Sequence, residues 1–110
     1  MIDWAVVGIL QDEIGQDAFE EVVQLFLEEI SAEIEALTTD ATTKELEARF
    51  HVLKGSAVNL GFAEFANLCG AAETAAAAGT PTPCDISIIL HSYETSKEAF
   101  LSGLNLQKAG

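Results

Sequence analysis

Basic residues are scarce in this sequence. Five Lys and Arg stand against 18 Asp and Glu, which gives a formal net charge of −13. Such a surface repels the phosphates of DNA and RNA and the anionic headgroups of membranes. We therefore expect neither a nucleic acid nor a membrane among its partners, and we expect instead a protein with a basic or mixed face.

Cysteine is also rare, with two residues in the chain. Cys69 and Cys84 form no CxxC pair and are too few for a disulfide framework, which argues against a small disulfide-rich secreted protein. The apolar run from Trp4 to Leu10 is too short to span a bilayer, and it has neither a basic leader nor a cleavage site. These absences predict a cytoplasmic protein.

The two prolines both lie in TPTPC, residues 80–84, and no convincing alternation of apolar and polar residues indicates a strand. Hydrophobic residues make up 49% of the 110 residues, which is enough for one core. Helical spacing predicts five helices, at about residues 3–14, 17–37, 43–60, 63–78 and 85–106. We expect residues 1–110 to form a single all-α domain, an antiparallel four-helix bundle with an additional short N-terminal helix.

Local signals mark the ends of these helices, and apolar residues mark their buried faces. Threonines in TTDATT, residues 38–43, can cap the third helix, and Gly15, Gly61 and Gly79 can end helices. The predicted core positions of the third helix are Leu46, Phe50, Leu53, Ala57 and Leu60. Those of the fourth helix are Phe65, Cys69, Ala72 and Ala76. Those of the last helix are Ile86, Ile89, Leu90, Tyr93, Phe100 and Leu104.

The third helix carries a histidine that faces away from this core. At roughly 100° per residue from Leu46, His51 lies near 140°, Lys54 near 80°, Gly55 near 180° and Val58 near 120°. A glycine costs a helix about 1 kcal/mol relative to alanine, so Gly55 needs a reason. An exposed imidazole beside a cation, a bare backbone patch and an apolar neighbour suits a nucleophile that meets another protein's active site.

Imidazole chemistry fits such a role. Its unperturbed pKa near 6.5 leaves much of it neutral and nucleophilic at pH 7. Phosphoryl transfer asks mainly for positioning and charge stabilisation, and Lys54 could supply that charge. Glu47, four residues before His51, could hold the other ring nitrogen, although an acid at this spacing is common on any exposed helix.

Other site chemistries fit less well. His51, Cys69, Cys84 and His91 lack the paired spacing of a zinc site, and neither histidine follows a glutamate at the spacing of a di-iron bundle. No activated serine pattern indicates a hydrolase. We interpret His91 as an ordinary surface residue, while Leu25, which is off its helix's apolar face, could pack against the first helix or belong to a docking surface.

Residues 51–61, HVLKGSAVNLG, closely resemble the signature of histidine-containing phosphotransfer (HPt) domains, H-x-L-K-G-S-[SA]-x-x-[LF]-G. Leu68, Cys69 and Glu73 are similar to the family's downstream L-C-x-x-[LA]-E stretch. The resemblance implies that His51 is phosphorylated through its distal ring nitrogen, that Lys54 contacts the phosphoryl group and that Gly55 lets a receiver domain approach. It implies structural hydrogen bonds for Ser56 and Asn59.

The resemblance also implies the partners: a hybrid sensor histidine kinase and a response-regulator receiver domain, between which His51 relays the phosphoryl group. The chain would be a monomeric phosphocarrier without a self-contained active site and without a cofactor or metal, because Mg²⁺ belongs to the receiver. Many relatives carry a basic residue near the end of the fourth helix, whereas ETAAAAG, residues 73–79, has none. Lys54 could therefore be the only cation that serves His51.

Two alternatives stay open. One is a binding-only HPt-like domain, against which the intact His51 and Lys54 argue. The other is the phosphoacceptor domain of a chemotaxis-type histidine kinase, which a catalytic domain phosphorylates directly and which would normally continue into further domains.

Overall fold

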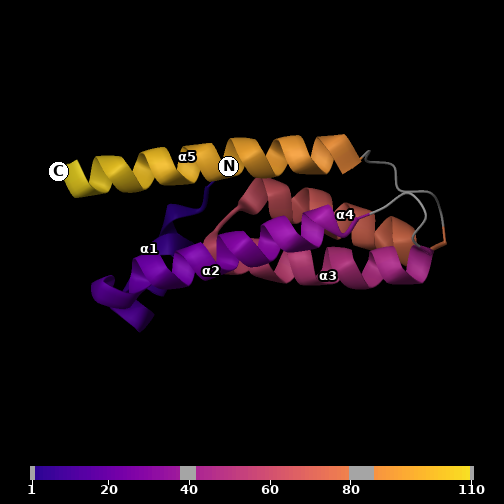
Figure 1. Cartoon of the computed structure of the whole chain (residues 1–110), viewed down its shortest axis with the longest axis horizontal. Helices are drawn as coiled ribbons and strands as arrows, with labels where there is room; N and C mark the ends of the chain where they lie inside the picture. The colour runs from indigo at the N-terminus through magenta and orange to yellow at the C-terminus, as the bar shows by residue number, and fades with distance from the viewer. Residues whose placement is uncertain (1, 38–41, 80–85, 110) are drawn as a thin grey trace.

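The described residues form five helices, and Figure 1 shows how these helices are arranged. The computed structural model describes residues 2–37, 42–79 and 86–109. The helices are α1 (Trp4–Ile14), α2 (Gln16–Glu35), α3 (Thr43–Leu60), α4 (Ala63–Ala77) and α5 (Ile86–Ala109), and the described residues contain no strand. The prediction of an all-α bundle with an extra N-terminal helix is therefore confirmed. Residues 38–41 of the TTDATT segment, and the predicted break at residues 80–84 with Cys84, lie outside the described residues.

The ends of α3 follow the predicted signals. Thr42 caps its start: the side chains of Thr42 and Glu45 each accept a hydrogen bond from the other's backbone N–H. Gly61 ends the helix with a left-handed φ of 79°, which favours glycine. A Cβ at Gly61 would also lie 2.6 Å from the backbone oxygen of Asp3, so the residue is small for packing as well. These two ends fix where α3 begins and where the chain turns into α4.

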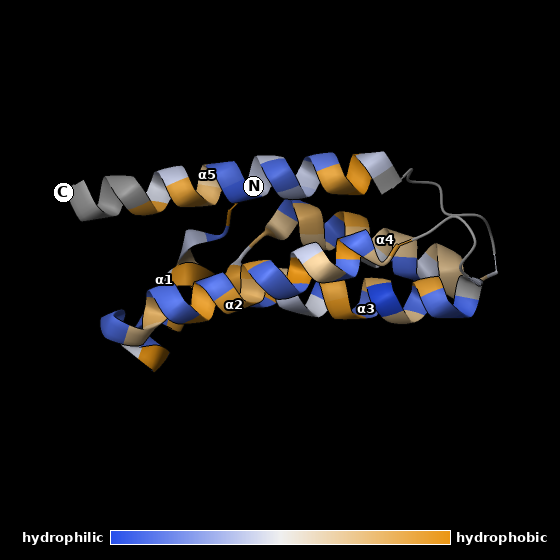
Figure 2. Ribbon diagram, in the orientation of Figure 1, coloured by the Kyte–Doolittle hydropathy of each residue, from blue (hydrophilic) through white to orange (hydrophobic). Residues whose placement is uncertain are grey.

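The buried faces of α3 and α4 meet in the centre of the core. Every predicted core position of α4 is buried, and so are those of α3 apart from the partly buried Leu46. Alanines on both faces let the two backbones approach closely. Figure 2 shows hydrophobic and hydrophilic residues sharing each helix, as expected for elements with one buried face. The close α3–α4 pair is the frame that carries His51.

The buried stripe of α5 is narrower than predicted. Ile89, Tyr93 and Phe100 are buried, but the prediction that Leu90 is a core residue is wrong, because its side chain is 43% exposed. Leu90 lies about 100° around the helix from Ile89, and the stripe continues instead through the buried Ser96. The side chain of Ile86 lies outside the described residues.

Helix α1 lies against the end of the bundle, where several contacts hold it. Val7 is buried, and the N–H of Asp3 donates to the carbonyl of Gly61 over 2.7 Å. The Trp4 ring stacks on Phe100 with 5.9 Å between ring centroids, and a Cβ at Gly103 would collide with the Trp4 ring. Helix α1 is thus a fixed part of the domain surface.

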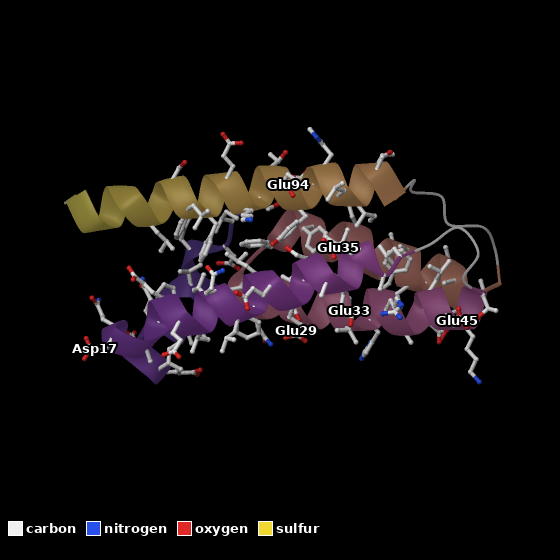
Figure 3. The ribbon with its side chains drawn as sticks, in the orientation of Figure 1. Asp17, Glu29, Glu33, Glu35, Glu45 and Glu94 are labelled. Atoms are coloured by element: carbon white, nitrogen blue, oxygen red, sulfur yellow. The ribbon has the colours of Figure 1, made fainter. Side chains whose placement is uncertain are left out.

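Acidic side chains cover several helices, as Figure 3 shows for α2, α3 and α5. The labelled acids are Asp17, Glu29, Glu33, Glu35, Glu45 and Glu94, and of these only Glu33 is partly buried. Glu33 pairs with Arg49 at 3.0 Å. Within the described residues, no helix is both long and apolar enough to cross a membrane.

Candidate functional site

His51 stands on the outer face of α3. Its side chain is 71% exposed, which confirms the predicted outward direction. The next turn of the helix begins at Gly55, where an added Cβ would meet no atom within 4 Å. The imidazole is therefore open to a partner on the side of this glycine.

Glu73 of α4 holds one ring nitrogen of His51. Its Oε2 lies 2.8 Å from Nδ1, while its Oε1 lies 3.2 Å from Nζ of Lys54. One carboxylate thus bridges the imidazole and the ammonium group. The structure does not support the hypothesis that Glu47 holds the ring, because Glu73 of the neighbouring helix binds Nδ1.

The turn between α3 and α4 explains why these residues meet. His51 and Glu73 each lie eleven residues from Phe62, and Lys54 and Gly70 each lie eight residues from it. In an antiparallel helix pair, residues at equal distances from the turn face each other. A Cβ at Gly70 would lie 3.3 Å from Cδ of Lys54, so this glycine leaves room for the lysine stem to lie along α4 and reach Glu73.

The environment of Glu73 keeps it ionised. Partial burial raises the pKa of this carboxyl, but the hydrogen bonds with His51 and Lys54 and their positive charges outweigh that effect. The net result is a pKa below the ordinary value for glutamate. Glu73 is therefore a carboxylate at neutral pH, and what its charge contributes to the bridge is lost as the pH falls through this lowered pKa.

An ionised Glu73 determines what His51 can do. A carboxylate only accepts hydrogen bonds, so the neutral imidazole must carry its proton on Nδ1. The lone pair is then on Nε2, the nitrogen farther from the backbone. The site presents a nucleophilic Nε2 on an exposed ring, and the carboxylate that holds Nδ1 also holds the ammonium group of Lys54.

The other residues named from the sequence differ in their exposure to solvent. Val58 is 53% exposed, and Leu25 is exposed on α2 rather than buried beneath α1. Ser56 is buried, Asn59 is exposed, and His91 is exposed on α5, as expected of a surface residue. The docking roles of Gly55 and Val58 stay predictions.

The structure does not assemble the zinc set considered from the sequence. Cys69 is fully buried, whereas His51 and His91 are exposed. Over the described ranges, no three or more His, Cys, Asp or Glu side chains cluster as metal ligands would, and Cys84 lies outside those ranges.

Comparison with known protein families decides the relationship. The family model described as Hpt domain matches residues 21–99, which is most of the chain and includes His51, Lys54 and Glu73. The chain belongs to the Hpt domain family. Neither the comparison with curated proteins nor that with solved structures found a match.

Membership of the Hpt family indicates the general function of the chain. Hpt domains take part in phosphotransfer in two-component signalling, where they interact with receiver domains and kinases of phosphorelays. The matched region begins inside α2, so α1 lies outside it. The matched region ends at residue 99, inside α5, and it contains all of α3 and α4.

Replacing Glu73 tests the link between the bridge and the ring proton. In Glu73→Ala, the Nδ1–H has lost its acceptor, so we expect the neutral imidazole to become a mixture of both tautomers. NMR shifts of the ring nitrogens at a pH where His51 is neutral would measure this. Glu73→Gln is the matched control, because its amide oxygen can still accept from Nδ1 and should preserve the tautomer. An unchanged tautomer in Glu73→Ala would contradict the assigned role.

Proposed function

We propose that this Hpt domain is a phosphorelay intermediate whose His51 accepts a phosphoryl group from a receiver-domain aspartate and passes it to another response-regulator receiver. The observation that supports this most strongly is the exposed imidazole whose Nδ1 is held by Glu73. Lys54 contacts the transferring group, and Gly55 and Val58 contact the docked receiver. The upstream partner is the receiver of a hybrid sensor histidine kinase.

The site's geometry supports a specific transfer step. The Nε2 lone pair attacks the phosphorus of an aspartyl phosphate. The N–P bond forms as the bond from phosphorus to the aspartate oxygen breaks, and its electron pair leaves with the aspartate carboxylate. The ring keeps its Nδ1 proton and becomes positively charged, and Glu73, already 2.8 Å from Nδ1, balances that charge.

Lys54 supplies charge on the phosphoryl side. The transition state of phosphoryl transfer spreads negative charge over the three oxygens that are neither attacking nor leaving. The side chain of Lys54 is 43% exposed, and its ammonium group lies 3.2 Å from Glu73, so it is close to the ring and can turn toward those oxygens. Arg49, the nearest other cation along α3, is paired with Glu33.

A transfer assay tests the proposal against both alternatives. The protein is incubated with an isolated receiver domain that carries radiolabelled aspartyl phosphate, and separately with a chemotaxis-type kinase catalytic domain and ATP. We expect the receiver to deliver label that is labile in acid and stable in base, as a phosphohistidine is. Receiver binding without label would favour a binding-only domain, and label from the catalytic domain alone would favour a chemotaxis-type phosphoacceptor.

A further inference from the structure

A groove runs between α2 and α5. Its volume is about 350 Å³, and its walls include Leu27, Glu28, Ala32 and Glu35 of α2 with Lys97 and Leu101 of α5. The two helices run antiparallel (Figure 1). The hydroxyl of Tyr93 joins them, because it donates to the carbonyl of Leu27 and bonds with the hydroxyl of Ser31, each at 3.2 Å. These bonds fix the two walls of the groove relative to each other.

The groove continues into an apolar stripe of α5. Leu101 lines the groove and is 40% exposed. Leu90, which is 43% exposed, lies eleven residues before Leu101, and this spacing places both on one face of the helix. The stripe from Leu90 to Leu101 is about 16 Å long, or three helical turns. The apolar surface is therefore long enough for several side chains of a partner.

The two edges of the groove differ in charge. Glu28 and Glu35 are exposed along the α2 edge, and α2 contains no Lys or Arg. Lys97 lies on the α5 edge, with its ammonium nitrogen 6.0 Å from the centre of the Tyr93 ring. Within the part of the chain that the structure describes, Lys97 forms no ion pair. The α2 edge therefore attracts cations, and Lys97 can pair with an anion.

The shape of the groove favours a helix as its occupant. Two neighbouring helices leave a groove into which the side chains of a third helix can pack. A helix bonds its own backbone groups, whereas an extended segment gains affinity by pairing with a sheet edge, and the described residues contain no strand. Gln24 and Glu35, at the two ends of the α2 wall, are about 16 Å apart along the helix, which matches the stripe on α5.

The groove and the phosphoacceptor lie on different sides of the bundle. Helix α3 packs against both α2 and α4, and α5 packs against α4. His51 lies at the α3–α4 edge, where it contacts Glu73. The α2–α5 groove is across the bundle from that edge. A partner in the groove and a receiver at His51 would therefore cover separate surfaces.

We infer that the α2–α5 groove binds an amphipathic helix of a partner protein. The apolar side chains of that helix fill the groove, its Lys or Arg residues lie over Glu28 and Glu35, and an acid lies over Lys97. A second copy of this chain is disfavoured, because it would bring another acid-rich helix to the acidic edge. The inference goes beyond the proposed function: the groove is a second attachment point, through which a partner stays bound while His51 exchanges phosphoryl groups.

A synthetic peptide tests this inference. The probe is an amphipathic helix of about four turns, with Leu on one face at helical spacing, Lys along one flank and Glu along the other. One control peptide has the same composition in scrambled order, and a second has Glu in place of every Lys. We expect the first peptide alone to cause saturable NMR shifts of backbone amides, centred on α2 and α5. At saturation it should leave the rate of phosphoryl uptake from a receiver unchanged.

Filling the groove provides the matched variant. Ala32 is exposed and lines the groove, so Ala32→Trp can place an indole there without disturbing the core. We expect the Kd of the peptide to rise about tenfold, which is the usual loss when one anchoring side chain is displaced. Ala71→Trp, the same change at an exposed alanine of α4, should leave the Kd unchanged. Glu28→Gln combined with Glu35→Gln should raise it severalfold and weaken its dependence on salt.

Several results would overturn the inference and leave the proposed function intact. These are the absence of saturable shifts with the first peptide, equal binding of the scrambled peptide, or an equal rise of the Kd in Ala71→Trp. A peptide that competes with the receiver would bind at the His51 face instead and would also overturn it. So would a wild-type dimer that Ala32→Trp dissociates, because a second copy would then occupy the groove.

Discussion

His51→Gln should take no detectable phosphoryl group from a phosphorylated receiver. Glutamine has a similar reach and can still approach Glu73, but it has no nucleophilic nitrogen. The His51 side chain is 71% exposed and belongs to no buried cluster, so its replacement should leave the bundle folded. The measurement is the amount of acid-labile label after incubation with the receiver, together with a thermal melt that compares the variant with the wild type.

His91→Gln is the matched control for this variant. It removes the other histidine, also exposed, from α5. We expect its labelling to equal that of the wild type, because His91 forms no ion pair within the described part of the chain. Label that persists in His51→Gln, or that disappears in His91→Gln, would place the phosphoryl group on a different residue.

Lys54→Ala should slow transfer by roughly tenfold to a hundredfold. Loss of one charge-stabilising group costs about a hundredfold or more where water is excluded. Water can replace part of the charge here, because the side chain is 43% exposed. No Lys or Arg stands between Glu73 and Gly79 on α4, so a substitute cation is lacking on that segment. Single-turnover rates from a saturating phosphorylated receiver would measure the loss.

Two further variants separate the charge of Lys54 from its stem. Lys54→Met keeps most of the apolar stem that lies beside Gly70 but has no charge, so it should be as slow as Lys54→Ala. Lys54→Arg keeps the charge and should retain most of the rate. If Lys54→Ala transferred at the wild-type rate, Lys54 would lose its role, and a fast Lys54→Met would assign the effect to packing.

The fold was predictable because its signals are local. Thr42 with Glu45 and Gly61 mark the ends of α3, and the spacing from Phe50 to Leu60 marks its buried face. Leu90 shows where such reasoning fails. The width of the face that neighbouring helices bury cannot be predicted from the sequence of one helix. The buried face of α5 is narrow, and it includes Ser96 but not Leu90.

The candidate site was predictable in part for the same reason. The outward direction of His51 follows from α3 alone, whereas its hydrogen bond to Glu73 depends on how α4 folds back. His51 and Glu73 lie the same number of residues from Phe62, so this count would have predicted their contact if the position of the turn had been known. The groove between α2 and α5 was less accessible still, since it requires the position of α5 relative to α2.

Glu73 should direct the phosphoryl group to Nε2 of His51, because it holds Nδ1 of the same ring. NMR of the phosphorylated protein, with isotopically labelled ring nitrogens, identifies the phosphorylated atom from its coupling to phosphorus. The structure predicts coupling to Nε2 of His51, with Nδ1 still protonated and bonded to Glu73. Coupling to Nδ1 of His51, or to either nitrogen of His91, would contradict this role of Glu73.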